Sequence, residues 1–462
     1  MVAASVSGKR ISVIGAGRSG VAVAELLAKH GARIFVSDNG NDEAIGSQIG
    51  ILKSLGIPWE VGEHSEKVFD CSLMVISPGV PTSAPVVAEA QRRSIEVVSE
   101  LEVASWYCRA PMVAVTGSNG KTTTTTLIGR ILGDANKRHA VAGNIGTAFS
   151  SVAEELDETS VAVLEVSSFQ LDTCKTFRPR VSMILNITED HMDRYDHSME
   201  KYSASKARVF MNQMGEDTLL TNADDAGSQK VVAQARCRIL PFSVTERLDS
   251  GAFLEGRNMV TVVEGKREVV IPADEISIPG IHNLYNAMAA TLAGQLSGVS
   301  VPSIRATLRN FKGVEHRLEF VREVGGVRFI NDSKATNVDA VWYALQAYRV
   351  PIVLMLGGRD KGNDYSRLFD LVRKNVRAVV AMGESVGKVV AALQDKARLE
   401  VVRTEGSEIP NRASMDKAVR TAYGLAKPGD VVMLSPACAS FDWFKNYEER
   451  GKIFKAIVQA LS

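Results

Sequence analysis

Residues 115–127, VTGSNGKTTTTTL, contain residue types that bind nucleotide phosphates. Gly120-Lys121-Thr122 fits the end of the phosphate-loop pattern G-x-x-x-x-G-K-S/T, but Val115 stands where the first glycine is expected. The apolar run before the loop and LIGRIL after it predict a strand, a loop and a helix. Loop N–H groups would then form an anion nest, Lys121 would add positive charge, and the Thr122 hydroxyl could bind Mg²⁺. We interpret the stretch as a shortened phosphate loop, although five consecutive threonines could also form a strand.

A phosphate loop needs an acidic partner for its metal ion, and two candidates follow in the sequence. Glu165 closes the apolar run VAVLE, where a carboxylate suits Mg²⁺, although a solvated strand end is the ordinary alternative. The second candidate is LNITEDHMDRY at residues 185–195, which is unusually dense in polar groups. We interpret it as a metal or phosphate site rather than ordinary loop polarity. Its candidate residues are Asn186, Glu189, Asp190, His191 and Asp193.

A second glycine-rich turn lies near the N-terminus. Residues 15–20, GAGRSG, form a G-x-G-x-x-G pattern between an apolar run and a helix-like segment. Asp38 follows the next apolar run at the spacing of a ribose-binding acid. The context favours a nucleotide-like ligand over a merely tight turn, and it leaves binding of a dinucleotide open.

The C-terminal half contains further polar loops. His282, Asn283 and Asn286 in IPGIHNLYNAMAA stand at a predicted helix start, where one residue would be a cap and three suggest a ligand such as a purine. Arg317 could donate to an ATP phosphate or form a surface salt bridge. Polar residues cluster in the loops at three strand ends, and the basic and hydroxyl groups among them suggest a small anionic substrate. These polar residues are Asp332, Ser333, Lys334, Thr336, Asn337, Lys361, Ser435, Ser440 and Lys445.

The segments that carry these loops predict an α/β chain with parallel sheets. Most of the apolar runs are nearly continuous in Val, Ile, Leu and Met, as in strands covered on both faces, and helix-like segments lie between several of them. Ligands of such sheets gather at the carboxyl ends of the strands, where the polar loops stand. VVEGKREVVIP predicts a local hairpin. We predict domains over residues 1–99, 100–313 and 314–462.

Composition excludes several classes of protein. The chain has 462 residues, 45% of them hydrophobic, and a formal net charge of +1, which argues against nucleic acid or an anionic membrane as partner. No apolar run approaches the length of a membrane span. Five scattered cysteines suit reduced thiols. We therefore expect a cytoplasmic protein, with a monomer as the default.

Several segments together resemble one enzyme family. TGSNGKTT, LEVSSFQL, NITEDHMDRY, GIHNLYNAMAA, EHRLE, NDSKATN and LSPACASFDWFKNYEERG occur in the order found in the Mur ligases of peptidoglycan synthesis. The resemblance covers essentially the whole chain and is closest to the members that add D-glutamate. A shortened phosphate loop is normal in that family. It implies a Rossmann-like N-terminal domain, a central P-loop ATPase domain with a parallel sheet, and a C-terminal Rossmann-like α/β domain.

The resemblance also implies a reaction. ATP would phosphorylate the carboxylate of UDP-N-acetylmuramoyl-L-alanine, and the amine of D-glutamate would attack the resulting acyl phosphate. Mg²⁺ at two sites, with Mn²⁺ as a possible substitute, would neutralise the anions that meet there. No nucleic acid and no membrane take part.

Site residues are transferred by resemblance. As catalytic residues it implies Lys121, Glu165, His191, Lys206 and Lys334. For ATP it implies Gly117, Ser118, Asn119, Gly120, Lys121, Thr122, Thr123, Asn283, Arg317 and Asp332. For metal it implies Thr122, Glu165, His191 and a carbamylated Lys206. For the UDP substrate it implies Arg18, Ser19, Asp38, Asn39, Ser77, Pro78, Gly79 and Asn144. For D-glutamate it implies Lys334, Thr336, Lys361, Ser440 and Phe441, which is often leucine in relatives.

From the residues alone, Lys206 would be interpreted as a solvated helix lysine, so its metal role rests wholly on the resemblance. Three other functions compete with the main one. The nearest is a related ligase that adds L-alanine or meso-diaminopimelate, or a folylpolyglutamate synthase. A nicotinamide-dependent oxidoreductase would explain the N-terminal glycines but not the Gly-Lys-Thr loop. A P-loop motor or nucleic-acid remodeller is disfavoured by the neutral charge.

Overall fold

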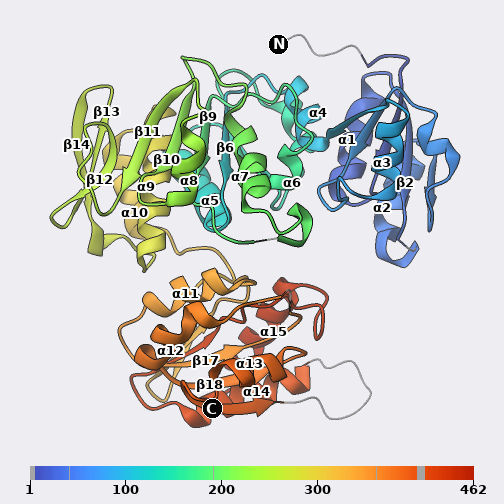
Figure 1. Cartoon of the computed structure of the whole chain (residues 1–462). Coiled ribbons are helices and arrows are strands. Elements are labelled where there is room, and N and C mark those ends of the chain that lie inside the picture. Colours follow the sequence, from blue (N-terminus) through green and yellow to red (C-terminus); the bar gives the residue numbers. More distant parts are fainter. Residues whose placement is uncertain (1–5, 41, 191, 361, 403–411, 462) are drawn as a thin grey trace. The chain divides into compact units, whose positions relative to one another are not determined.

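The computed structural model describes residues 6–40, 42–190, 192–360, 362–402 and 412–461, so His191 and Lys361 lie outside the described residues. Three separate sheets confirm the predicted three-domain α/β fold (Figure 1). The chain divides into two compact units, one of Met1–Glu275 with Tyr285–Asn310 and one of Ile276–Leu284 with Phe311–Ser462. Each unit is described by itself. The domain boundaries at residues 99 and 313 stay predictions.

The first sheet is parallel throughout and has the order β3-β2-β1-β4-β5. Its apolar strands are covered on both faces: Ile11 and Val13 face one buried cluster, and Ile14 faces another. This explains why the runs are continuously apolar. The elements are β1 (Arg10–Ile14), α1 (Arg18–Lys29), β2 (Arg33–Asp38), α2 (Asp42–Ser54), β3 (Trp59–Val61), β4 (Leu73–Ile76), α3 (Pro85–Arg92), β5 (Glu96–Ser99) and α4 (Glu100–Tyr107).

The central sheet has nine strands in the order β14-β13-β12-β11-β10-β9-β6-β8-β7. Strands β6 to β12 are parallel, and β13 with β14 forms the predicted hairpin, which is confirmed. Its strands are β6 (Met112–Thr116), β7 (His139–Gly143), β8 (Val161–Glu165), β9 (Val181–Ile184), β10 (Thr218–Asn222), β11 (Arg238–Ser243), β12 (Gly251–Glu255), β13 (Asn258–Val263) and β14 (Lys266–Pro272). Its helices are α5 (Lys121–Asp134), α6 (Ser168–Leu171), α7 (Met199–Ala207), α8 (Ala226–Val232), α9 (Ile281–Leu296) and α10 (Val301–Asn310).

The threonine tract is helical, so the alternative of a strand is wrong. Gly120 caps α5 with a φ of 87°, a left-handed conformation that favours glycine. Thr122–Thr125 are buried, and Thr125 Oγ1 donates to the carbonyl of Lys121 at 2.8 Å. Leu127 and Ile131 are buried one turn apart on the same helix. Tertiary burial therefore overrides the weak helix propensity of threonine.

The third sheet has the order β15-β16-β20-β17-β18-β19, with only β15 antiparallel to its neighbour. Alternate residues of β17 face two different apolar clusters, because successive side chains of a strand point to opposite faces. The elements are β15 (Glu319–Val324), β16 (Val327–Asn331), α11 (Val338–Gln346), β17 (Ile352–Leu356), α12 (Phe369–Asn375), β18 (Val376–Met382), α13 (Val386–Leu393), β19 (Arg398–Val402), α14 (Arg412–Leu425), β20 (Val431–Leu434) and α15 (Tyr447–Gln459).

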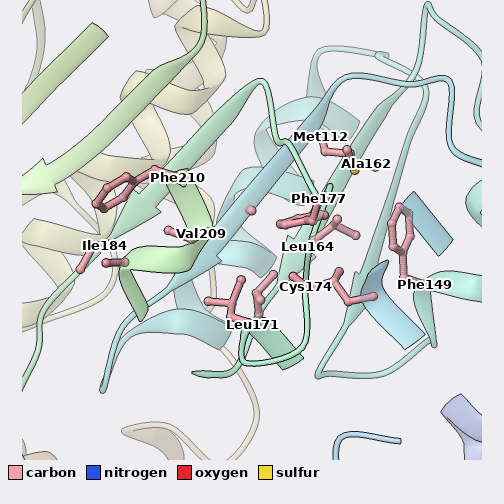
Figure 2. Packing of buried hydrophobic residues seen from close by; sticks show 14 of the residues in the cluster. Met112, Phe149, Ala162, Leu164, Leu171, Cys174, Phe177, Ile184, Val209 and Phe210 are labelled. Carbon is pink, nitrogen blue, oxygen red and sulfur yellow. The ribbon is translucent and has the colours of Figure 1, made fainter. Parts of the chain in front are cut away.

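Among the described residues, no helix is long and apolar enough to cross a membrane. The core of the central sheet packs one face of β6 and β8 against aromatic side chains and short helices. Figure 2 shows Leu164 of β8 beside Phe177, with Leu171 and Cys174 nearby. This cluster supports the strand whose last residue is Glu165.

We predict that Leu164→Ala destabilises the protein by about 2–5 kcal/mol, because the side chain is fully buried and its removal leaves a cavity. Urea unfolding measures the loss. Met214→Ala is the control in the same unit, since Met214 is 52% exposed and should change stability by less than about 0.5 kcal/mol. Equal effects of the two substitutions would contradict the packing described here.

Candidate active site

The phosphate loop lies at the carboxyl edge of the central sheet. Strand β6 leads into it and pairs with β9 on one side and β8 on the other, so three strand ends meet there. Gly117 and Gly120 both have positive φ, and a Cβ on Gly120 would stand 2.4 Å from Asn286 Oδ1. Lys121 Nζ donates to the carbonyls of Gly117 and Ser118 at 2.7 and 2.8 Å. Hydrogen bonds from Lys121 to two loop carbonyls therefore hold the loop in a compact conformation.

Asn186 holds this loop in place from the end of β9. Its Oδ1 accepts from the Asn119 N–H at 2.8 Å, and its Nδ2 donates to the Asn119 carbonyl at 3.1 Å. Its own carbonyl accepts from the Ser118 N–H at 2.9 Å. The sequence suggested Asn186 as part of a metal or phosphate site, whereas here it supports the loop. The N–H groups of Ser118 and Asn119 are therefore already bonded within the chain.

Glu165 ends β8 with a buried carboxylate. The residue is 2% exposed, and its Oε1 accepts from Asn144 Nδ2 at 3.1 Å. Its Oε2 is buried without a hydrogen-bond partner among the described residues. Such orphaned buried oxygens are rare and call for an explanation. A divalent cation beside the nearby phosphate loop fits this oxygen, with the buried Thr122 at the start of α5 as a further oxygen donor.

Lys206 is buried, so interpreting it as a solvated lysine is wrong. It is 2% exposed, its Nζ donates to the Gly117 carbonyl at 3.0 Å, and it lies 4.5 Å from the centre of the Tyr202 ring. Burial lowers its pKa well below the usual value, the Lys121 charge lowers it further, and Asp190 and Asp172 oppose the shift. This environment favours a neutral, nucleophilic amine.

A cavity of about 650 Å³ lies at the carboxyl edge of the first sheet. It brings together all eight residues that the resemblance implies for the UDP substrate, which are Arg18, Ser19, Asp38, Asn39, Ser77, Pro78, Gly79 and Asn144. Asp38 also shapes the glycine turn, since its oxygens accept from the N–H groups of Ala16 and Gly40 at 2.6 and 2.7 Å.

The glycines of that turn differ in what surrounds them. A Cβ on Gly20 would stand 1.8 Å from the Gly15 carbonyl oxygen, so this position allows the close approach of helix and turn. A Cβ on Gly17 would meet nothing within 4 Å, although Gly17 lines the cavity. Open space above a helix N-terminus suits a phosphate group. The cavity also contains His64, which the sequence did not indicate.

In the third sheet, three loops meet where β16, β20 and β17 end side by side. They contain Lys334 and Thr336, which are half-buried, Ser440, which is buried, and Phe441, which is 60% exposed. Asp332 starts the first loop, and its carboxyl accepts from Ser435 Oγ at 2.8 Å. Burial raises the pKa of Asp332 to about 7, although Ser435 and Arg317 oppose the shift.

Arg450 joins two of these loops and was not singled out from the sequence. Its guanidinium is fully buried and donates to the Ser333 hydroxyl and carbonyl at 2.9 and 2.7 Å. It also donates to the carbonyls of Cys438 and Ala439. Burial lowers its pKa to about 10, so the charge persists at neutral pH. Arg450 thereby fixes the backbone beside Lys334 and Ser440.

Three further residues predicted to contact ATP, Asn283, Arg317 and Asp332, belong to the unit of Ile276–Leu284 with Phe311–Ser462. Asn283 Nδ2 donates to the Pro279 carbonyl at 2.7 Å, and burial with the Arg317 charge lowers the pKa of His282 to about 4. Arg317 Nε is buried without a hydrogen-bond partner among the described residues. Asn286 belongs to the unit that contains the phosphate loop, and its Oδ1 accepts from Thr124 Oγ1 at 3.1 Å.

A further cluster of potential metal ligands lies next to the ammonium group of Lys455. It consists of Glu315, His316 and Glu319. Lys455 Nζ lies 2.7 Å from a carboxylate oxygen of both glutamates. Because Lys455 already neutralises these two carboxylates, we interpret the cluster as an ion-pair group rather than a metal site.

Comparisons with known proteins agree over the whole chain. Residues 9–99, 115–294 and 316–438 match, in that order, the families described as Mur ligase MurD-like N-terminal domain, Mur ligase middle domain, and Mur ligase glutamate ligase domain. A protein of Chloroherpeton thalassium named UDP-N-acetylmuramoylalanine--D-glutamate ligase is 45% identical, with 99% of both chains covered. A Salinibacter ruber protein of the same name is 44% identical, with 98% of both chains covered.

Solved structures show the same fold at low identity. A pseudomurein peptide ligase type C from Methanothermus fervidus is similar with a TM-score of 0.62 and 18% identity, covering 98% of this chain and 100% of that one. UDP-N-acetylmuramate-alanine ligase MurC from Thermotoga maritima has a TM-score of 0.60 and 18% identity, covering 98% and 99%.

The fold and its strand-edge sites define a three-domain ligase with a phosphate loop. The chain belongs to the Mur ligase family and is a ligase of peptidoglycan synthesis.

We predict that Asn186→Ala weakens ADP binding by about 10-fold, because the phosphate loop loses both side-chain hydrogen bonds that fix Asn119. Asn186→Asp should be intermediate, since it can still accept from the Asn119 N–H but cannot donate to the carbonyl. Calorimetric titration with ADP measures both variants. Unchanged affinity in Asn186→Ala would show that the loop keeps its shape without this side chain.

Proposed function

We propose that the chain joins D-glutamate to UDP-N-acetylmuramoyl-L-alanine at the expense of ATP, through an acyl phosphate. Relatives that carry the name of this activity match nearly the full chain. The proposal assigns the cavity of the first sheet to the UDP substrate, the central phosphate loop to ATP, and the loops of the third sheet to D-glutamate.

One contact supports the proposal most directly. Asn144 lines the cavity of the first sheet and also donates a hydrogen bond to Glu165, at the metal edge of the central sheet. A substrate whose nucleotide occupies the cavity could therefore extend its acid end toward the phosphate loop. A sugar nucleotide with a distant carboxylate has this shape, whereas NAD would leave the loop unused.

The first step is transfer of the γ-phosphoryl group to the acceptor carboxylate. The carboxylate oxygen forms a bond to phosphorus, the bond to the β-phosphate oxygen breaks, and ADP leaves. Lys121 would turn from the loop carbonyls toward the phosphates and offset their negative charge. Mg²⁺, held by Glu165, Thr122, His191 and a modified Lys206, would supply further charge neutralisation. The roles of Asn283, Arg317 and Asp332 toward ATP stay predictions.

The second step is attack of the D-glutamate amine on the acyl carbon. The carbon–nitrogen bond forms, inorganic phosphate leaves, and the amine loses a proton. Lys334, Thr336 and Ser440 supply positive charge and hydroxyl groups at one sheet edge, which suits the two carboxylates of D-glutamate. Lys361 and Phe441 complete the predicted pocket. The exclusion of water from this step depends on closure around the substrates.

Lys206 would be carbamylated in the active enzyme. Its lowered pKa favours the neutral amine, which adds to the carbon of CO₂ and releases one proton to leave a carbamate. The product is an anion with two oxygen donors in place of a neutral amine. The carbamate and the Lys121 ammonium would then attract one another. We further expect a monomer in the cytoplasm.

We predict that ADP release from ATP and UDP-N-acetylmuramoyl-L-alanine depends on D-glutamate. A coupled assay compares D-glutamate with L-glutamate, L-alanine and meso-diaminopimelate at equal concentration. Only D-glutamate should raise the rate, by at least about 100-fold, because the pocket must orient its amine. Faster release with another amino acid would assign a different acceptor specificity.

We predict that Lys206→Ala lowers kcat by about 100-fold or more and that acetate or another short carboxylate restores part of it. The added acid would stand in for the carbamate oxygens. Lys201→Ala is the matched control on the same helix, since Lys201 is an exposed partner of Asp196 and should keep full activity. Loss of activity in Lys206→Ala that no added acid relieves would contradict the carbamate.

A further inference from the structure

His64 lies in the nucleotide cavity and has no part in the proposed reaction. It follows β3, the edge strand beside β2, and it lines the cavity together with Asp38 and Asn39. In Rossmann-like domains the acid at the end of the second strand meets the ribose. The side of the cavity that contains His64 is therefore suited to the nucleoside, while the diphosphate would lie over the start of α1.

One nitrogen of the His64 ring is held by the protein. Nδ1 is 2.7 Å from Ser37 Oγ, and Ser37 Oγ is 2.8 Å from Glu60 Oε1. Glu60 also accepts from Ser65, at 2.9 Å from its N–H and 2.5 Å from its hydroxyl. Burial alone would raise the pKa of Glu60. The hydrogen bonds have the larger combined effect, so the pKa of Glu60 is lowered. At neutral pH Glu60 is therefore ionised and only accepts.

These contacts fix which nitrogen of His64 has the proton. Ser37 has a single hydroxyl proton, and the ionised Glu60 takes it, so the Ser37 oxygen must accept from His64 Nδ1–H. Burial lowers the pKa of His64, although Glu60 and Asp38 oppose this shift, and the ring is neutral at pH 7. A neutral ring with its proton on Nδ1 has a lone pair on Nε2. Within the part of the chain that the structure describes, no hydrogen bond occupies Nε2.

We propose that His64 recognises the nucleoside of the substrate, with Nε2 accepting a hydrogen bond from a nucleoside donor. The donor is either the imide N–H of uracil or the ribose 2′-hydroxyl. A diphosphate oxygen is excluded, because it also accepts. The inference rests on the proposed function, since it takes this cavity to be the UDP site. It would make His64 a specificity residue without a role in the chemical steps.

The test is calorimetric titration of the full-length protein with UDP, with ADP at saturation to occupy the phosphate loop. The amide of glutamine reaches the position of Nε2, whereas that of asparagine reaches only Nδ1. His64→Asn should therefore bind UDP about 5- to 10-fold more weakly, and His64→Gln within about 2-fold of the unmodified protein. Glu63→Gln, at the exposed preceding residue, is the control and should bind normally.

Two further ligands identify the donor. If it is the imide N–H, CDP should bind the unmodified protein no more tightly than His64→Asn, because cytosine N3 has a lone pair instead of a proton. If it is the ribose 2′-hydroxyl, 2′-deoxy-UDP should bind with equal affinity to the unmodified protein and to His64→Asn.

Equal UDP affinity in all variants, or equal loss in the asparagine and glutamine variants, would overturn the role of His64. Failure of the unmodified protein to bind UDP would instead refute the proposed nucleotide site itself. Melting temperatures of the variants show that each is folded.

Discussion

A buried carboxylate oxygen, Glu165 Oε2, is the point on which the candidate site depends. It has no hydrogen-bond partner among the described residues, while the other oxygen of the same group is held by Asn144. Removing such an oxygen from water without compensation is unfavourable. A cation bound beside this oxygen would supply the missing interaction. Asn144 also lines the cavity of the first sheet, so this carboxylate is one hydrogen bond away from a residue of that cavity.

The backbone around this carboxylate is shaped before any ligand arrives. Asn186 fixes Asn119 through both ends of its amide, and Asn286 lies against Gly120, where only a glycine leaves room. In the third sheet, Arg450 does the same for the loops that contain Lys334 and Ser440. Charged and polar groups held in this way need little rearrangement when charge develops in the transition state. Asn186 and Arg450 thus hold loop backbone in place through hydrogen bonds from their side chains.

The sequence was most informative where local pattern determines structure. The apolar runs predicted parallel strands, and Gly-Lys-Thr after one of them predicted the loop and helix at residues 117–134, because these features depend on neighbouring residues. The glycine turn and Asp38 likewise predicted a nucleotide-like site, and the structure places them in one cavity. The strand alternative for the threonines was wrong. Their burial against other segments stabilises the helix, and the local sequence does not show which segments will pack there.

Contacts between distant segments could not be predicted in the same way. Asn186 supports a loop 67 residues earlier in the chain, and nothing in LNITED distinguishes that role from metal binding. Lys206 resembles a solvated helix residue until the fold buries it against Gly117. His64 and Arg450 gave no signal, because a lone histidine after a short strand and an arginine in a charged helix are common. His191 and Lys361 lie outside the described residues, so their roles stay predictions.

The most direct test is the effect of Mg²⁺ on ADP affinity in the unmodified protein and in Glu165→Gln. The glutamine keeps an oxygen for Asn144 but loses the carboxylate. Calorimetry should show that Mg²⁺ strengthens ADP binding to the unmodified protein and leaves the variant nearly unaffected, at an unchanged melting temperature. The same Mg²⁺ enhancement in a folded Glu165→Gln variant would contradict the assignment of the cation to this oxygen.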